Sequence, residues 1–339
     1  MELSKKEINA IQGLSVLAMV CLHLFCRNDL SEVCTPLIYI NNIPLAYYFG
    51  QLADFCVFGF AFCSGYAHNI LFHIDEKYYK NRLKSLFKLF INYWLVIIIF
   101  SFIGVVTNNT EIPGTAVEFL GNFFLYNMTY NGAWWYMLTY LLIVITSGLV
   151  IKIVNKYPIK SIIVLTLIYI ISYIFRFKNS FDNFFIIQSY LYGMTIFEYS
   201  IGIIFNKYEI FTKIKNILKN TNSKLIGSCF ILIFIILLVC RTLVVRTLIV
   251  APLSGIIVII IFNYFYNKIS IFKIFDFIGK HSTNIWLTHM FFYIGLFPGF
   301  IYIAKFPVLI ILLMLIVTIC FSYIILFVKN FIINKIVVI

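Results

Sequence analysis

The chain has 339 residues, of which 62% are hydrophobic and only 12% are charged, a composition far outside the range of soluble globular proteins. Its 26 Lys and Arg residues against 13 Asp and Glu residues give a formal net charge of +13. The basic residues lie in short breaks between apolar runs, which argues against a nucleic-acid partner. The composition also excludes collagenous, disordered and disulfide-framework proteins, and it predicts a protein of the lipid bilayer.

Apolar runs long enough to cross a bilayer predict an all-α, polytopic membrane protein with about ten transmembrane helices. The expected spans are, in chain order, 8–26, 45–72, 86–107, 133–152, 160–176, 185–205, 225–240, 246–266, 282–303 and 306–328. The second span is long enough to be tilted or kinked. Segment 116–130 is apolar but carries Glu118 and two Asn residues, so we expect a re-entrant or interfacial piece. The connections are too short for a soluble domain, so 1–339 is expected to form one transmembrane domain.

An even number of spans places both termini on the same side of the membrane. With a cytoplasmic N-terminus, 20 of the 26 basic residues lie inside, and the remaining six are Arg27, Arg176, Lys178, Arg241, Arg246 and Lys305. This bias is the one that orients membrane proteins, so we expect both termini in the cytoplasm. Arg241 and Arg246 flank a very short outer turn, where they would face either an anionic group of a substrate or the lipid headgroups.

Ionisable side chains inside the spans need a partner or a function, because a charge is costly in lipid. His23 lies in the outer half of the first span, and Gln12 precedes it by eleven residues, which places both on one helix face about 16 Å apart. His289 and Ser282 share a face of the ninth span in the same way. Two histidines from different spans could converge on a cavity within the membrane, although a membrane histidine often makes only an interhelical hydrogen bond.

Other polar positions allow more than one interpretation. Asp54 and Glu198 each require a proton or a partner, and either could orient a histidine or pair with a nearby Lys or Tyr. His68, His73 and His281 fall near the expected cytoplasmic interface, where solvated side chains are the simpler interpretation.

Small residues and aromatic residues form two further patterns. Ser64 and Gly65 interrupt a Phe-rich helix, which favours close helix packing over a serine nucleophile, because no nucleophile elbow surrounds Ser64. Trp134 and Trp135 open the fourth span from outside, where an aromatic belt or a sugar-stacking surface would place such rings. None of the 8 Cys residues forms a CxxC pair, so no spacing supports a metal site.

Four motifs follow one another along the chain. They are Ala10–His23, with eleven residues from Gln12 to His23; Phe62–Tyr66, with Ser64 and Gly65; Arg82 with Lys88–Trp94; and Ile278–His289, with Gly279, Lys280, Ser282, Ile285, Trp286 and Leu287. In this order and at these spacings they resemble the acyltransferase-3 family of integral membrane acyltransferases, which modify bacterial surface and secreted glycans. In that family an essential histidine matches His23. The chain departs from the family pattern at Gln12, which is usually Arg or Lys, and at Asn92, where a proline is common.

The resemblance implies transfer of an acyl group, most simply acetyl, from cytoplasmic acyl-CoA to a hydroxyl of a cell-surface polysaccharide or its lipid-linked precursor. His23 would be the general base, with an acyl-imidazole intermediate as a variant, and His289 and Ser282 would complete the catalytic site. Donor contacts would come from Gln12, Ser64, Arg82, Lys88 and Lys280, and acceptor contacts from Trp134, Trp135, Arg241 and Arg246.

The implied setting is the bacterial plasma membrane, with acetyl-CoA as co-substrate, a surface glycan or lipid-linked sugar as acceptor, and no metal. The chain could act alone or as a homo-oligomer. Because Gln12 carries no charge, Lys5, Lys6, Arg82 or Lys280 would supply it near the donor. Two alternatives are an exporter of a polysaccharide or small molecule built on the same fold, and a membrane partner that has lost activity.

Overall fold

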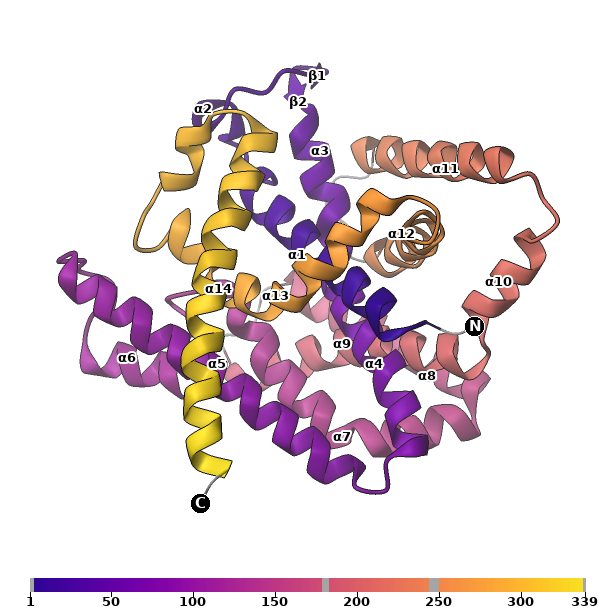
Figure 1. Cartoon of the computed structure of the whole chain (residues 1–339), viewed down its shortest axis with the longest axis horizontal. Coiled ribbons are helices and arrows are strands. Elements are labelled where there is room, and N and C mark those ends of the chain that lie inside the picture. The colour runs from indigo at the N-terminus through magenta and orange to yellow at the C-terminus, as the bar shows by residue number, and fades with distance from the viewer. Residues whose placement is uncertain (1–2, 179–182, 244–249, 338–339) are drawn as a thin grey trace. The chain divides into compact units, whose positions relative to one another are not determined.

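The computed structural model describes residues 3–178, 183–243 and 250–337, and α-helices make up nearly all of this part of the chain (Figure 1). The two strands it contains, β1 (Tyr39–Ile40) and β2 (Ile43–Pro44), form a single antiparallel pair. The predicted all-α class is therefore confirmed.

The helices follow in the order expected from the apolar runs. Their bounds are α1 Lys5–Phe25, α2 Leu30–Val33, α3 Leu45–Leu52, η1 Ala53–Phe55, α4 Cys56–Ile74, α5 Tyr78–Val106, α6 Ala116–Phe123, η2 Gly132–Trp134, α7 Trp135–Lys156, α8 Pro158–Lys178, α9 Phe184–Lys207, α10 Ile210–Leu218, α11 Ser223–Leu243, α12 Ala251–Tyr266, η4 Ser270–Lys273, α13 Ile274–Thr288, η5 His289–Phe292, η6 Phe300–Ala304 and α14 Pro307–Val337.

Seven helical segments of the described chain are long and apolar enough to cross a membrane, or eight if a bent pair counts as one span. The expected count of ten is not reached by this measure. Helix α9 forms where the sixth span was expected but is not among the seven, because polar residues such as Gln188 and Glu198 lower its mean hydropathy. The bent pair joins 251–266 to 270–292 at an angle of 113°.

The ninth span differs most from expectation. A continuous helix was expected over 282–303, but α13 ends at Thr288 and is followed by the 3₁₀ turns η5 and η6. Gly299 between these turns has a φ of +81°, a conformation that glycine adopts without strain. His289 therefore begins a turn at the end of a helix instead of lying inside a long one.

The described chain divides into two compact units, each assembled from separate stretches. Unit 1 contains residues 1–26, 48–79 and 142–280, and unit 2 contains residues 27–47, 80–141 and 281–339. Helix α13 contributes its first half to unit 1 and its second half to unit 2.

Helices α4 and α9 pack most closely in unit 1, and two glycines make this possible. A Cβ atom at Gly65 would lie 1.8 Å from the Tyr199 carbonyl oxygen, and one at Gly202 would lie 2.1 Å from the Phe62 carbonyl oxygen. Side chains there would push the two backbones apart. The small-residue packing predicted around Ser64 and Gly65 is therefore confirmed.

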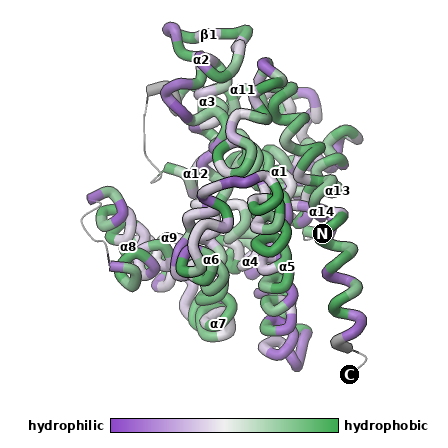
Figure 2. Tube along the Cα trace, turned by 90° about the vertical axis from the view of Figure 1, so that its left-hand side faces the viewer, coloured by the Kyte–Doolittle hydropathy of each residue, from purple (hydrophilic) through white to green (hydrophobic). Residues whose placement is uncertain are grey.

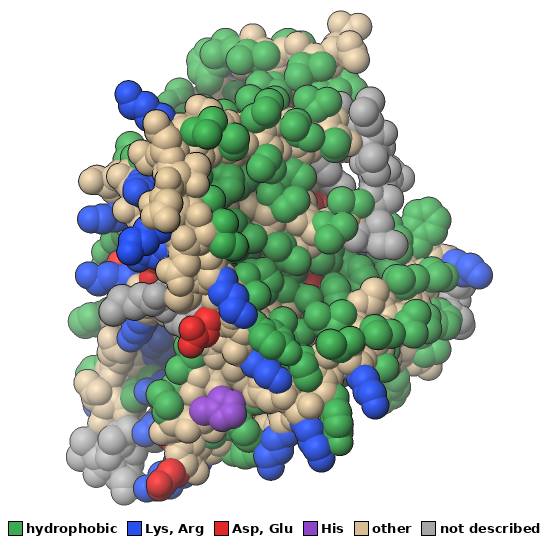
Figure 3. All heavy atoms as spheres, turned by 90° about the vertical axis from the view of Figure 1, so that its right-hand side faces the viewer, with side chains coloured by type: hydrophobic (Ala, Val, Ile, Leu, Met, Phe, Trp, Pro, Cys, Tyr) green, Lys and Arg blue, Asp and Glu red, His purple; other side chains and the backbone are tan. Residues whose placement is uncertain are grey.

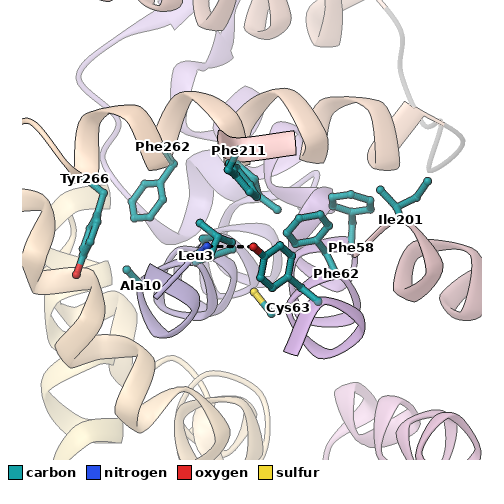
Figure 4. Close-up of a cluster of buried hydrophobic side chains, with 12 residues drawn as sticks. Leu3, Ala10, Phe58, Phe62, Cys63, Ile201, Phe211, Phe262 and Tyr266 are labelled. Carbon is teal, nitrogen blue, oxygen red and sulfur yellow. Dashed lines mark hydrogen bonds between the residues drawn. The ribbon is translucent and has the colours of Figure 1, made fainter. Parts of the chain in front are cut away.

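An aromatic core fills the space beside this contact (Figure 4). Phe58, Phe62 and Tyr66 of α4 pack with Phe211 of α10, and the Tyr66 hydroxyl accepts a hydrogen bond from the Leu3 backbone N–H at 3.0 Å. This bond ties the start of the chain to α4 within unit 1.

The outer surface of the helices is apolar, as a bilayer requires. Figure 2 shows a long hydrophobic stretch in α5 with hydrophilic residues at one of its ends. Figure 3 shows a face made largely of hydrophobic side chains, with Lys and Arg side chains at its edges. Exposed large side chains such as Phe102, Ile163 and Phe327 belong to helices that meet the criterion for a membrane span.

Candidate functional site

The first helix of unit 1 is fixed by its capping box. Glu7 accepts hydrogen bonds from the Ser4 backbone N–H at 2.7 Å and from Asn267 Nδ2, which follows α12, at 2.8 Å. After this capping box α1 continues without a break to Phe25. Gln12 and His23 therefore lie on one face of the same helix. Both side chains are half-buried, and His23 lies in the last turn.

Two glycines bring the first half of α13 against α1 in unit 1. A Cβ atom at Gly279 would lie 1.9 Å from the Asn9 carbonyl oxygen, and one at Gly13 would lie 2.0 Å from the Phe275 carbonyl oxygen. The backbones of α1 and α13 therefore touch at Gly13 and Gly279. Gln12 and Lys280 are the sequence neighbours of these two glycines. The glycine of the last sequence motif therefore serves helix packing.

Lys280, predicted to contact the donor, is held beside this contact. Its Nζ lies 3.0 Å from Asp276 Oδ2, and Asn9 Nδ2 donates to Asp276 Oδ1 at 3.3 Å. Asp276 is mostly buried, whereas 58% of the Lys280 side chain is exposed. The Lys280 ammonium group thus remains accessible to an anion.

Polar side chains of α4 make hydrogen bonds within the protein. Ser64 Oγ donates to the Phe60 carbonyl oxygen of its own helix at 2.9 Å. His68, expected to be solvated, is only 3% exposed, and its Nδ1 lies 3.1 Å from the Tyr199 hydroxyl. The solvated interpretation of His68 is therefore wrong, because α9 covers this face of α4. His73, one turn later, is exposed as expected.

The two buried carboxyl groups of unit 1 lie near one another. Asp54 and Glu198 are 7% and 4% exposed, and Glu198 lies within electrostatic range of both Asp54 and Arg176 of α8. Tyr169 of α8 lies in the same range. The structure thus provides an Arg and a Tyr as partners for these carboxyl groups.

In unit 2 the second half of α13 carries a chain of buried polar side chains. Asn92 Nδ2 of α5 donates to Asn284 Oδ1 at 3.0 Å, and Asn284 Nδ2 donates to Ser322 Oγ of α14 at 2.9 Å. His281 Nδ1 lies 2.9 Å from the same Ser322 Oγ. His281 is 5% exposed, so the solvated interpretation of this residue is also wrong: α14 covers it.

His289 is completely buried, and its ring is oriented by the backbone. Its Nδ1 donates to the Trp286 carbonyl oxygen at 2.8 Å, which leaves Nε2 as the acceptor nitrogen of the neutral ring. Ser282, on the same helix, is 5% exposed. His289 and Ser282 belong to unit 2, whereas His23 belongs to unit 1.

The two tryptophans at the start of α7 lie in different surroundings. Trp134 is fully buried, donates from Nε1 to the Leu287 carbonyl oxygen at 3.1 Å, and packs against Tyr93. Trp135 is half-buried. Protein contacts therefore surround the ring of Trp134, and Trp135 is the more accessible of the two.

The remaining predicted cationic residues are distributed over both units. Arg82 and Lys88 lie on α5 in unit 2. Arg82 Nε is buried and has no hydrogen-bond partner within the described part of the chain, and Lys88 is exposed, within electrostatic range of Lys329. Arg246 lies outside the described residues, as does the side chain of Arg241.

Arg27, another residue of the expected outer set, is already engaged in unit 2. Its guanidinium pairs with both carboxylate oxygens of Asp29 and donates to the Tyr302 hydroxyl at 3.1 Å. The arginine holds the pKa of the Asp29 carboxyl below its ordinary value. The guanidinium of Arg27 therefore joins Asp29 to Tyr302 within unit 2.

Sequence reasoning missed the amide pair Asn92–Asn284 and the contact that Asn131 makes. Asn131 Nδ2 donates to the Leu287 carbonyl oxygen at 3.1 Å, near the end of α13. The sequence did indicate that these amides are bonded, because amides inside apolar spans need hydrogen-bond partners. Spacing along one helix cannot say which other helix supplies them.

The fold and these polar residues define a polytopic membrane protein, and comparison with protein families identifies its class. A family model described as an acyltransferase domain matches residues 5–327, nearly the whole chain. The protein is thus a multi-pass membrane acyltransferase. The chain belongs to the acyltransferase-3 family, as the resemblance of its motifs predicted. Neither the curated proteins nor the solved structures yielded a match.

Proposed function

We propose that the protein is an O-acyltransferase of the bacterial plasma membrane. It moves an acyl group, most simply acetyl, from cytoplasmic acyl-CoA to a hydroxyl of a cell-surface polysaccharide or of its lipid-linked precursor. The match of the acyltransferase family to residues 5–327 is the observation that carries this proposal. The separation of basic residues, with 20 of 26 on the expected cytoplasmic side, supports an anionic donor there.

His23 acts as the general base in this proposal. It takes the proton of the acceptor hydroxyl, the hydroxyl oxygen bonds to the thioester carbonyl carbon, the carbon–sulfur bond breaks, and the thiolate leaves as the thiol after gaining a proton. Half-burial of His23 at the end of α1 supports this role, since a base must be reachable and yet shielded from bulk water.

Donor recognition is assigned to cationic and polar groups at the expected cytoplasmic side. Lys280, held by Asp276 in unit 1, is an exposed ammonium group suited to a phosphate of the donor, and so, separately, is Lys88 of α5 in unit 2. Trp135, half-buried at the start of α7, suits contact with the acceptor sugar.

His23→Ala tests the proposal in membranes that contain the protein, with acetyl-CoA carrying a radioactive acetyl group. We expect transfer of label to membrane glycan to fall by about 10² to 10⁴-fold, the usual contribution of a general base. His73→Ala is the matched control, because His73 is exposed and lies outside the proposed site. Full transfer by the His23 variant would exclude this base, and label transfer absent from the unmodified protein would exclude the acetyl donor.

A further inference from the structure

The buried hydroxyl of Ser322 is bonded differently from those of Thr318 and Ser200. A serine or threonine inside a helix usually donates to the carbonyl oxygen one turn earlier. Thr318, one turn before Ser322 and equally buried, does this with Met314 at 2.7 Å, and Ser200 of α9 does it with Ile196. Ser322 Oγ instead lies 2.9 Å from His281 Nδ1 and 2.9 Å from Asn284 Nδ2.

The direction of these hydrogen bonds follows from the chemistry of the amide. Asn284 Nδ2 also lies 3.5 Å from the Ser322 carbonyl oxygen, a position that suits an NH₂ group and not a second oxygen. Asn284 therefore donates to Ser322 Oγ. We assign the hydroxyl proton of Ser322 to His281 Nδ1, its other partner among the described residues, and this assignment places the proton of the neutral imidazole on Nε2.

A hydroxyl that donates to a neutral imidazole at this distance has the arrangement of a nucleophile and its general base. Asn284 orients the oxygen, because its amide is itself fixed by Asn92 of α5. All four residues belong to unit 2, so the arrangement is complete within one compact unit.

A second observation points to a ligand at the same network. Asn92 Oδ1 is buried and has no hydrogen-bond partner among the described residues, and Asn92 as a whole is 5% exposed. A buried carbonyl oxygen without a donor is costly. The pantetheine arm of acyl-CoA carries secondary amide N–H groups, which are donors of the kind that this oxygen lacks.

We infer that Ser322 is an acyl-accepting nucleophile, with His281 as its base, and that the acyl group rests on Ser322 before it reaches the acceptor. This inference rests on the proposed acyl-CoA-dependent function. His281 Nδ1 takes the Ser322 proton, Oγ bonds to the thioester carbonyl carbon, the carbon–sulfur bond breaks, and the thiolate leaves with the proton from His281. The acceptor hydroxyl then attacks the acyl-serine, a step that replaces its direct attack on the thioester. The bond from the carbonyl carbon to Ser322 Oγ breaks, and the acceptor's proton returns to this oxygen.

Complete burial of Ser322 suits such an intermediate, because an ester shielded from water is protected from hydrolysis. The same burial means that α14 or its neighbours must move to admit the thioester. The acyl-serine thus separates capture of the donor from delivery to the acceptor.

The experiment uses the full chain in membranes with radioactive acetyl-CoA alone as the probe, quenched in acid at successive times. We expect label on the peptide that contains Ser322. Ser322→Ala should abolish this label and lower thiol release from acetyl-CoA on the order of 10³-fold or more. Thr318→Val removes a hydroxyl with the same burial one turn away, and it should keep both.

A second variant, Ser322→Cys, tests the inference even if the alanine variant fails to fold, because it keeps a nucleophile at this position. The label should then become removable by neutral hydroxylamine, as a thioester is and a serine ester is not. Wild-type turnover with no label at Ser322 at any time, or Ser322→Ala with wild-type thiol release, overturns the inference while leaving the acyltransferase proposal intact. A wild-type protein that neither transfers acetyl nor releases thiol overturns both.

Discussion

Two helix interfaces of this protein hold together by different means. In unit 1, α4 and α9 approach through Gly65 and Gly202, so that backbone atoms of one helix touch the other. In unit 2, α5, α13 and α14 are joined by the side-chain hydrogen bonds of Asn92, Asn284 and Ser322. Lipid provides no hydrophobic force between helices, so close packing and interhelical hydrogen bonds are the two available solutions.

The difference between the interfaces bears on function. Gly65 and Gly202 carry no side chain that could titrate or react, and they fix the geometry of α4 against α9. The polar contact joins α5, α13 and α14 through groups that can also exchange protons and bind a ligand. We therefore expect changes in the first interface to act on stability alone, and changes in the second to act on both stability and acyl transfer.

The largest expected effect is at the glycine contact. Gly65→Ala would place a Cβ atom 1.8 Å from the Tyr199 carbonyl oxygen, so we expect a loss of about 1–3 kcal/mol or more in the free energy of unfolding. Gly227→Ala in α11 is the control, since its Cβ would meet only Phe265 at 3.9 Å, and it should stabilise the helix by up to about 1 kcal/mol. Thermal unfolding in detergent measures both, and equal melting temperatures would contradict the packing argument.

A double-mutant cycle tests the polar contact. Asn92→Leu and Asn284→Leu each remove a partner from a buried amide, and each should cost about 1–2 kcal/mol. The double variant should cost less than the sum by about 0.6–1.7 kcal/mol, the coupling measured for hydrogen bonds within membranes. Denaturant titration in mixed micelles provides the four free energies. Strict additivity would show that the two amides do not stabilise each other.

A smaller loss of stability is expected from replacing Trp134 in unit 2. Trp134→Phe keeps most of the ring packing against Tyr93 but removes the hydrogen bond from Nε1 to the Leu287 carbonyl oxygen. We expect a loss of about 1 kcal/mol in stability, the net contribution of one hydrogen bond, because Asn131 Nδ2 still donates to the same carbonyl oxygen. Trp135→Phe serves as the comparison in the same melting experiment, and it should lower acyl transfer more than stability if Trp135 contacts the acceptor.

The smallest effect is expected at an exposed helix cap, where water competes with the hydrogen bonds. Glu118 accepts from the Thr115 backbone N–H at 2.7 Å and from its hydroxyl at 2.9 Å, and these bonds hold the pKa of Glu118 below its ordinary value. The cap therefore stabilises α6 above the ordinary pKa of a glutamate, about 4.3. This stabilisation is lost as pH falls toward the lowered value.

Hydrogen exchange of the first amides of α6, corrected for intrinsic rates, measures the cap at pH 6 and at pH 3. We expect protection to fall at the lower pH in the wild-type protein. Glu118→Gln, which cannot ionise, should show the same protection at both values. A pH-dependent loss in the glutamine variant would assign the effect to another group.

The apolar runs predicted most helices to within a few residues, because the cost of exposing backbone polar groups to lipid forces such runs into helices. The first span was expected over 8–26 and is found as Lys5–Phe25, and the second was expected over 45–72 and is found over 45–74. The prediction of a continuous helix over 282–303 was wrong, because this apolar run folds into the second half of α13 and two 3₁₀ turns. Apolar composition is the same for a span and for turns buried inside protein, so it could not separate them.

In the candidate site, too, some residues could be identified from the sequence and others could not. His23, Gln12, Lys280 and His289 were singled out by motif and by their cost in lipid. His68 and His281 were assigned to the interface from their positions along the chain, yet neighbouring helices bury both. Asn284 was not singled out, although it donates to the hydroxyl on which the acyl-serine proposal depends.

The order of amino acids alone determined that this protein is helical, that it belongs in a membrane and that it carries the motifs of its family, because each property depends on local composition or spacing. Tertiary structure alone decided which hydroxyl turns from its own helix toward an imidazole and which glycines let two backbones meet. These pairings join residues as far apart as positions 92 and 284, and no local pattern encodes a partner on another helix.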